Sequence, residues 1–401
     1  MFILPCAVNL RLLDERFKEG FIFMKFLKIL PSAILAVLIL SSNALAYIGL
    51  CCAHCGGNMP LNIMGGGVPE THEFRFKLSQ GFMRMGPIKD GTDDVDSMKL
   101  LGMSSTANHK FGAVPTEMRS YMTMVSAAYS FTDDFAAMIM TGYKRNEMDM
   151  LRNGAEGFTM FSDGLADTKV MGKYRLFYDD NLAPTQQLSG VLGVSAPTGQ
   201  IDLGNTNHTN LALRGNILPF KMQTGTGTWD PILGITYQGS ADPFWYGVNG
   251  MWTGRLYDND QGYHAGDEFT LDLYGMFQFH EKALASFQLN TKYEEAYSDE
   301  PDKQKVSGEG HMNGNAAMAF MSPLFDPDNY GGIVTHATLG IQFQPIHLQI
   351  AELNVSVPIY QNLKGPQLSS DWMVRFSYYW EVPTKKSRRH TGFKPPKKLG
   401  F

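Results

Sequence analysis

The most reactive side chains of the sequence lie in one short run. Cys51, Cys52, His54 and Cys55 place three thiols and an imidazole within five positions. Thiolate and imidazole are ligands that Cu(I) and Zn prefer, so the run predicts a metal site, with copper as the candidate metal. The alternative is an oxidised cysteine pair with one free thiol in a flexible arm. Lipid attachment at Cys51 is a third hypothesis, but Leu50 stands where a lipid-attachment motif has a small residue.

Methionines form a second group that could do chemistry, because alternation gathers them on one face of each of three predicted strands. These thioethers are Met83, Met85, Met122, Met124, Met138 and Met140. Basic side chains lie on the inward face of the first of these strands or of the strand predicted at 168–178. They are Arg75, Lys77, Lys169, Lys173 and Arg175. Thioethers bind Cu(I), yet methionine more often packs adaptably against apolar partners. The positive charges nearby disfavour a cation site, so a lining for apolar solutes, or packing against a plug formed by the N-terminal arm, is the favoured interpretation.

Motifs of enzymes are weak in this sequence. Ser195 lies in Gly-Val-Ser-Ala-Pro, which lacks the final glycine of a nucleophile elbow and ends a strand. Residues 224–228, Thr-Gly-Thr-Gly-Thr, are rich in glycine but have no lysine and no helix after them, as a phosphate-binding loop requires. We therefore expect no catalytic site.

The N-terminal residues predict export. Met24 is a second plausible start, because Lys25 and Lys28 precede an apolar core at 29–40, and Ala44-Leu45-Ala46 fits a cleavage site. The apolar core is too short to span a bilayer as a helix. Residues 1–46 are thus interpreted as a leader with a signal peptide, and residues 47–72 as a Cys- and Gly-rich arm. Cys6 falls in the leader, which leaves an odd number of cysteines in the mature chain.

From about Glu73 onward the hydrophobic pattern has a period of two. One predicted strand is 121–131 and the next is 135–144, joined by a tight turn at 132–134. Further predicted strands are 168–178, 188–196, 231–237, 244–252, 269–279, 285–293, 333–343 and 372–380. Longer loops are expected at 87–107, 146–164, 296–312 and 323–332, where acidic residues, Gly and Pro collect.

These strands are roughly 9–12 residues long and several end in aromatic residues, which is typical of tilted membrane-spanning strands. Residues 73–382 therefore predict an all-β fold, a transmembrane antiparallel up-and-down β-barrel of about 12 strands (12–14). A soluble β-sandwich, which also alternates, is the competing fold. Charged residues are 18% of the chain and glycines number 41, so a coiled coil or an acidic disordered protein is excluded.

The net charge of −5 conceals two opposite parts. Removing the five basic and three acidic residues of 1–46 and the seven basic residues of 385–401 leaves 22 basic and 36 acidic residues, a net charge of −14 for 47–384. A body this acidic excludes nucleic acid as an expected partner. We expect its acidic loops to face lipopolysaccharide and outer-membrane lipid, and the C-terminal tail, 383–401, to be a basic extension.

Several stretches together resemble one family. They are Ser130 to Asp134, Gly164 to Lys169, Lys173-Tyr174-Arg175, Gly193 to Gly199, Leu218 to Pro231, Pro358 to Gln361 and Gly365 to Leu368. In this order, over about residues 119–381, they resemble the outer-membrane transporter-like proteins grouped with the meta-pathway phenol-degradation family of Gram-negative bacteria. The resemblance implies a single outer-membrane β-barrel and a channel for small molecules, and carries over no catalytic or ligand residues. The Cys-rich arm and the basic tail after Trp380 depart from the family's pattern.

Three functions follow as hypotheses. The first is an outer-membrane channel or transporter that passes a small solute, with apolar or aromatic solutes favoured. The second is handling of copper or another soft metal by Cys51, Cys52, His54, Cys55 and the methionines. The third is a plugged structural barrel that anchors partners. The sequence leaves solute identity, direction of flux and oligomeric state open.

Overall fold

The computed structural model describes residues 59–64, 71–102, 110–180, 184–387 and 390 of the chain. Its elements, in chain order, are β1 (Glu73–Gly91), β2 (Asp93–Val95), α2 (Ser97–Leu100), β3 (Ala113–Ser130), β4 (Phe135–Arg152), β5 (Ala155–Leu165), β6 (Thr168–Tyr178), β7 (Gln186–Ala196), η1 (Leu211–Leu213), η2 (Phe220–Met222), β8 (Asp230–Ala241), β9 (Phe244–Thr253), β10 (Glu268–His280), β11 (Ala283–Glu294), α3 (Asp302–Ser307), η3 (Met312–Gly314), η4 (Pro323–Phe325), η5 (Pro327–Asn329), β12 (Gly332–Phe343) and β13 (Gln349–Pro383). Among these residues no helix is long and apolar enough to cross a membrane.

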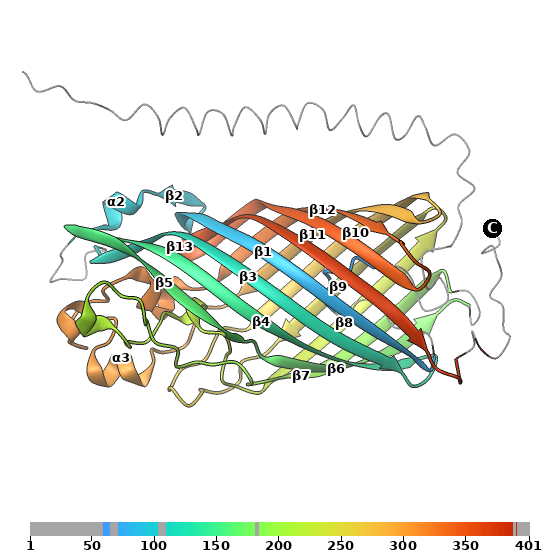
Figure 1. Cartoon of the computed structure of the whole chain (residues 1–401), viewed down its shortest axis with the longest axis horizontal. Coiled ribbons are helices and arrows are strands. Elements are labelled where there is room, and N and C mark those ends of the chain that lie inside the picture. The colour runs from blue at the N-terminus through green and yellow to red at the C-terminus, as the bar shows by residue number, and fades with distance from the viewer. Residues whose placement is uncertain (1–58, 65–70, 103–109, 181–183, 388–389, 391–401) are drawn as a thin grey trace, which may run out of the picture. The chain divides into compact units, whose positions relative to one another are not determined.

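The strands form a closed antiparallel barrel (Figure 1). Each neighbour pairs with the next in the order β1, β3, β4, β6, β7, β8, β9, β10, β11, β12, β13, and β13 pairs back with β1. This last pairing joins Glu73 to Pro383 and continues to Gly91 and Leu363. Because β2 and β5 lie outside the ring, eleven of the thirteen strands close it.

The last strand, β13, crosses the wall twice. Residues 351–363 pair with β12, whereas residues 363–383 pair with β1. The two halves run in opposite directions and contact each other, since Ser370 N donates to Gln361 Oε1 at 2.8 Å. Counting β13 twice among the eleven ring elements gives twelve crossing segments. The predicted barrel of about 12 strands is confirmed.

Alternation gives the wall an apolar outer face and a polar inner face. Exposed apolar side chains on the strands include Leu78, Val125, Ile139, Val170, Leu192, Leu233, Ile235, Val248, Leu273, Leu339, Ile341 and Val355. Buried polar side chains on the same strands include Ser79, Ser120, Asn146, Ser189, Thr236, Asn249, Gln288, Thr338, Asn354 and Ser377. An apolar exterior around a polar interior is the inverse of a soluble sandwich, and it suits contact with lipid.

Aromatic rings bound the apolar outer band on both sides. Phe74 lies 4.6 Å from Tyr129 between ring centroids, near one end of the barrel. Phe82 lies 5.0 Å from both Tyr121 and Trp372 towards the other end. Eight residues of β1 separate Phe74 from Phe82, which corresponds to roughly 26 Å along the strand and about 20 Å of height at a tilt near 40°. That height is close to the ~25 Å apolar band of membrane barrels.

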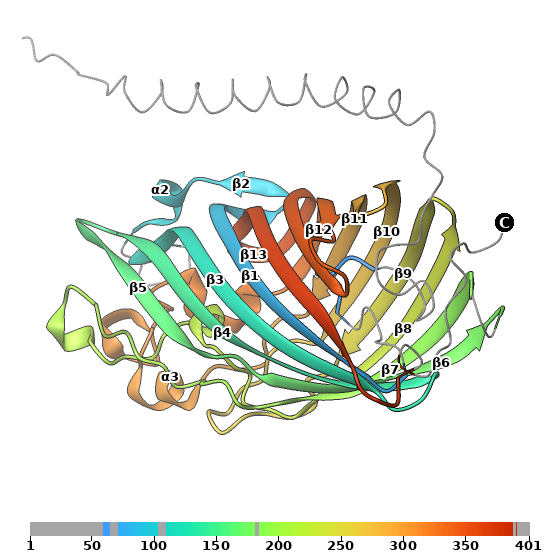
Figure 2. The ribbon, with the colours of Figure 1, turned by 45° about the vertical axis from the view of Figure 1, so that its right-hand side comes forward.

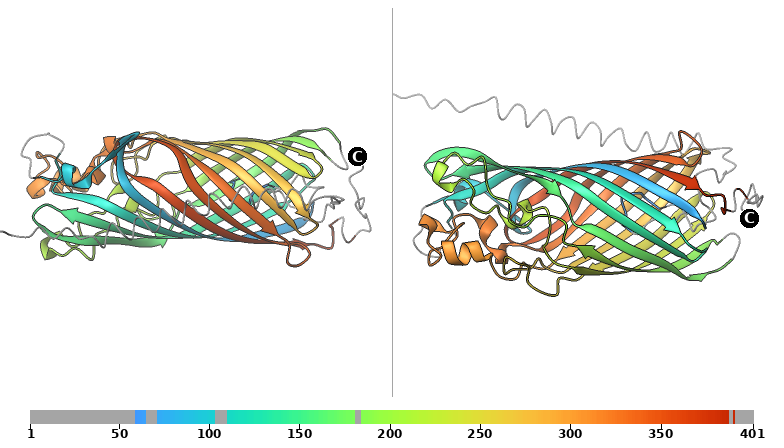
Figure 3. Two further views of the ribbon diagram at one scale, coloured as in Figure 1. Left: turned by 90° about the horizontal axis from the view of Figure 1, so that it is seen from above. Right: turned by 60° about the horizontal axis from the view of Figure 1, so that its bottom comes forward.

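The two ends of the barrel differ. One end carries the short connections 131–134, 242–243 and 281–282, and the other carries the long connections 197–229, 254–267 and 295–331. We call these the short-turn end and the long-loop end. Figure 3 shows α3 and the long connections gathered at one end and the tight turns at the opposite end.

The wall is also unequal in height around the ring. β1, β3 and β4 have 19, 18 and 18 residues, whereas β7 and β9 have 11 and 10. Residues 143–152 of β4, towards the long-loop end, pair with β5, and residues 135–140, towards the short-turn end, pair with β6. Figure 2 shows β3, β4 and β5 projecting beyond the shorter strands at the long-loop end. We call β3, β4 and β5 the tall wall.

One expected loop is wrong. Residues 146–164, which their acidic and glycine content marked as a loop, instead continue β4, turn at 153–154 and return as β5. Asn146, Met148 and Met150 are buried on the inner face of this extension. Its acidic residues form ion pairs, as between Arg119 and Asp149 at 2.8 Å, so they are compatible with a strand beyond the apolar band.

A charge on the outer face provides a test of the barrel. Ile235 lies midway along β8 and its side chain is 53% exposed. Ile235→Arg should lower the free energy of unfolding in lipid by about 2–4 kcal/mol, because a cation at mid-bilayer depth loses its hydration. The change can be measured by urea titration in vesicles. Ala241→Arg, at the strand end, is the control and should cost about 0–1 kcal/mol; equal effects at the two positions would contradict the assigned membrane band.

Candidate functional site

A short N-terminal segment, Met59 to Met64, lies inside the barrel, and we call it the plug. It has no regular secondary structure, so its backbone groups bond to charged side chains of the wall. Leu61 N donates to Glu352 Oε2 at 2.6 Å, and Lys77 Nζ donates to Leu61 O at 2.8 Å. Glu352 is 1% exposed, so its carboxylate is buried together with the backbone groups that it binds.

Amide side chains fix the centre of the plug. Asn62 Nδ2 donates to Gln288 Oε1 at 2.8 Å, and Gln288 Nε2 donates back to Asn62 Oδ1 at 3.1 Å. Asn354 Nδ2 also donates to Asn62 Oδ1, at 3.2 Å, and Arg375 Nη1 donates to Asn62 O at 3.3 Å. Asn62 therefore uses its side chain and carbonyl to bind β11 and both halves of β13.

Apolar side chains of the plug pack on both sides of these hydrogen bonds. Met59 and Ile63 are 4% and 3% exposed. Their cluster, near the short-turn end, contains Trp245, Tyr274, Met276, Leu284, Ile350 and Tyr379. Met64 packs against a second cluster, of Met140, Met171, Val191, Ile232 and Met251, which Met124 and Met138 border.

The plug reaches across the lumen. Gln342 Nε2, on β12, donates to Met59 O at 3.2 Å, and Lys169 Nζ, on β6, lies 3.8 Å from Met64 Sδ. β6 and β12 are six crossing segments apart in either direction around the ring. Contacts with opposite walls mean that the plug obstructs the lumen rather than lining one side of it.

The residues that the sequence pattern singled out lie at different depths. Lys77, Lys169, Met124, Met138 and Met140 lie at the plug or in the cluster around it. Met85 instead packs against a cluster near the long-loop end, and Met83 and Met122 lie half-buried on β1 and β3. Arg75 pairs with Glu381 and lies 4.8 Å from the Tyr379 ring, and Arg175 bonds Asp134 at 3.1 Å near the short-turn end. Lys173 is buried on β6 with 3% exposure.

The predicted metal ligands Cys51, Cys52, His54 and Cys55 lie outside the described residues, as do the predicted signal peptide and most of the basic tail. Within the described ranges there is no group of three or more His, Cys, Asp or Glu side chains placed to hold a metal ion.

Sequence reasoning singled out Lys77 but missed the other residues that hydrogen-bond the plug. Glu352 and Asn354 were detectable as polar residues at inward positions of a strand, although nothing in the pattern assigns them a partner. Asn62 gave no signal, because it belongs to a segment without periodicity. Its partners come from strands more than 200 positions away.

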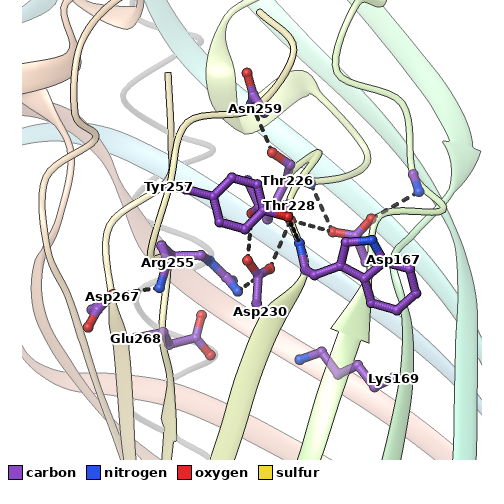
Figure 4. Close-up of polar contacts among 12 residues, drawn as sticks. Asp167, Lys169, Thr226, Thr228, Asp230, Arg255, Tyr257, Asn259, Asp267 and Glu268 are labelled. Carbon is purple, nitrogen blue, oxygen red and sulfur yellow. Dashed lines mark hydrogen bonds and ion pairs between the residues drawn. The ribbon is translucent and has the colours of Figure 1, made fainter. Parts of the chain in front are cut away.

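At the long-loop end, the connection 197–229 is fixed to the rim of the barrel by two carboxylates (Figure 4). Asp167 accepts hydrogen bonds from Gly199 N at 2.9 Å and from Thr226 N at 2.8 Å. Asp230 accepts from Thr228 Oγ1 at 2.5 Å and pairs with Arg255 at 2.5 Å. The glycine-rich stretch 224–228 thus binds carboxylates, and these negative charges make it unsuitable for a phosphate.

An aromatic cluster joins the three long connections. Phe220 contacts Tyr263, Tyr297 and Tyr330 at centroid distances of 5.0, 4.7 and 5.2 Å. Burial raises the pKa of Tyr263 to about 12, so its hydroxyl stays protonated at neutral pH. Lys221, next to Phe220, pairs with Glu294 at 2.5 Å and so ties this cluster to β11.

Comparison with solved structures relates this architecture to bacterial outer-membrane barrels. The COG4313 outer-membrane channel from Pseudomonas putida F1 aligns with a TM-score of 0.51 and 9% identity, over 81% of this chain and all of that one. The NanC porin aligns over 76% of this chain and all of its own at 8% identity and a TM-score of 0.39, and a Pseudomonas aeruginosa FadL homologue over 78% and 90% at 9% and 0.34. At these identities the similarity establishes the fold alone. No protein-family model and no curated protein sequence matches the chain.

The docking of the plug can be tested at Asn62. Asn62→Ala removes the paired amide bonds and leaves Gln288 and Asn354 with unmade hydrogen bonds. Each such loss costs about 1–3 kcal/mol, so the amide hydrogens of Leu61 and Ile63 should exchange roughly 5- to 150-fold faster. Hydrogen exchange read by mass spectrometry measures this change. Asn207→Ala, at an exposed loop position, is the matched control; unchanged exchange in the Asn62 variant would show that the plug is held by other contacts.

Proposed function

We propose that the protein is an outer-membrane channel of a Gram-negative bacterium that passes a small solute and is closed at rest by the plug. The plug, a segment bound to opposite walls of a polar lumen, is the observation that carries this proposal. The fold shared with an outer-membrane channel supports it. Following other barrels with unequal connections, the short-turn end faces the periplasm and the long-loop end faces outward.

The plug suits a gate because all of its contacts with the wall are noncovalent. It is only six residues long in the described chain, and it precedes β1 without forming part of a strand. Its withdrawal would break no strand pairing. The residues uncovered, including Lys77, Glu352 and Arg375, carry both signs of charge and would rehydrate in an open passage.

Replacing Leu61, Asn62, Ile63 and Met64 by glycine and serine should open the lumen. We expect larger and steadier single-channel conductance in planar bilayers than from the wild-type protein, because the wall loses its obstruction. Val306→Ser, at an 86% exposed position of α3, is the control and should behave as wild type. Equal conductance with and without the plug residues would overturn the gate. No conductance from either folded, heat-modifiable protein would instead favour a closed structural barrel.

Binding of copper or another soft metal is the second candidate function. The favouring observation is that Met64 of the plug packs among Met124, Met138, Met140, Met171 and Met251, which brings six thioethers to one cluster. Lys169 Nζ beside Met64 Sδ opposes it, because an ammonium repels a cation. Competition with a chromogenic chelator would measure Cu(I) affinity. If this function is right, Met64→Leu and the combined Cys51, Cys52 and Cys55→Ser variants should each bind at least about tenfold more weakly; unchanged affinity in both would exclude it.

A further inference from the structure

A second segment crosses the lumen on the long-loop side of the plug, and we call residues 218–224 the inner segment. It belongs to the connection 197–229 and contains η2. Every residue of the inner segment except Lys221 is buried. Met222 belongs to the same buried cluster as Met148 and Met150 of β4, whereas Phe220 packs on tyrosines of the other two long connections. The connection therefore enters the mouth of the barrel.

Lys221 joins opposite walls of the barrel. Lys144 Nζ, on β4, donates to Lys221 O at 3.3 Å, and Lys221 Nζ donates to Glu294 Oε1, at the end of β11, at 2.5 Å. β4 and β11 are six crossing segments apart in either direction around the ring. Lys221 Nζ also lies 5.8 and 5.9 Å from the ring centroids of Tyr297 and Tyr330, which favours this position of the ammonium. Lys221 therefore spans the lumen and narrows it independently of the plug.

Two lysines on the β4 and β6 side of the wall lie between the plug and the inner segment. Lys169 Nζ lies beside Met64 of the plug, and Lys144 Nζ bonds to Lys221. The strand register pairs Lys169 with Met140, so Lys144 is four residues nearer the long-loop end, roughly 13 Å along β4. Neither ammonium pairs with a carboxylate of the described residues. The lysines thus place two uncompensated positive charges at successive depths of the lumen.

Carboxylates of the opposite wall have cationic partners. Lys292 Nζ pairs with Glu268 at 2.7 Å and with Glu294 at 3.2 Å, and Glu294 also pairs with Lys221. Two lysines balance two carboxylates here, so the β10 and β11 side adds no net charge to the passage.

The remaining charged groups nearby do not cancel the two unpaired lysines. Asp230 pairs with Arg255 at the rim (Figure 4). Asp167 has no cationic partner within hydrogen-bonding distance, but three donors of the connection 197–229 bind its oxygens and hold it towards that connection. Deeper in the lumen, beside the plug, two cations lie near two carboxylates: Lys77, Arg375, Glu352 and Asp272. The passage between the plug and the inner segment therefore carries a net positive charge.

We propose that Lys144 and Lys169, with Lys221 across the lumen, form a constriction that selects anions, so that the solute is a small, negatively charged molecule. The proposal rests on the proposed channel function and names the solute class. A fixed charge on the wall of a narrow passage concentrates ions of opposite sign and repels ions of the same sign. A permeating anion would pair with Lys144 and Lys169 in turn, because the two lie at successive depths.

Ion selectivity can be measured in the plug-substituted protein as the reversal potential in a gradient of potassium chloride. We expect chloride to permeate at least about threefold more readily than potassium. Lys144→Met combined with Lys169→Met should bring this ratio to about one or below, because the side chains keep most of their length but lose their charge. Lys282→Met combined with Lys364→Met is the matched control, since it removes the same charge at exposed positions outside the passage and should leave the ratio unchanged.

Single-channel conductance tests the span of Lys221. In the plug-substituted protein, Lys221→Ala should raise the conductance roughly twofold, because the shortened side chain no longer reaches Glu294. Lys221→Met keeps most of the length and should raise the conductance less. Equal conductance of Lys221→Ala and the plug-substituted parent would overturn the constriction.

The outcomes separate anion selection from the channel itself. Conductance without a preference for chloride, or a preference that survives the double lysine substitution, would overturn anion selection while the channel stands. No conductance from folded, heat-modifiable, plug-substituted protein would overturn both. Loss of the chloride preference in the double variant, with conductance retained, is the result that we expect.

Discussion

The structure depends on one constraint: a backbone in lipid has no water to bond, so each N–H and C=O group must find a partner within the wall. The chain meets it by closing the sheet on itself, and the closing pair joins β1 to the last half of β13 over residues 73–91 and 363–383. Closure leaves the ring without an open edge and forces alternate side chains into a common interior. The lumen, the plug and the outer apolar band all follow from that closure.

Charged residues that face a narrow interior are costly unless they are paired or hydrated. This barrel pairs some of them along the wall, as Arg75 with Glu381, and satisfies others with the plug, whose backbone binds Glu352 and Lys77. The closed lumen is therefore stabilised by the same charges that an open, water-filled passage would hydrate. The plug is held by hydrogen bonds from backbone and amide groups and by the burial of Met59 and Ile63.

The unequal height of the wall separates the plug from a small pocket. Long strands on the β1, β3 and β4 side extend past the outer apolar band, and the connections from the short strands fold towards this extension. Asp167, Asp230 and the aromatic cluster around Phe220 hold those connections in place. The pocket forms where they meet the inner face of β4 and β5. One asymmetry of strand length thus produces a small cavity at the long-loop end, while the plug occupies the other part of the lumen.

Local alternation by itself determined the class of fold, the approximate strand number and which side chains face inward, because a period of two is a property of neighbouring residues. It also gave the bounds of β6 and of several other strands to within two residues, as for β11 and β12. Composition misplaced 146–164, where acidic residues resembled a loop but pair along the extended wall. The partners of Asn62 and of Glu352 had no sequence signal. They join segments up to 313 positions apart, and such proximity arises only when the ring closes.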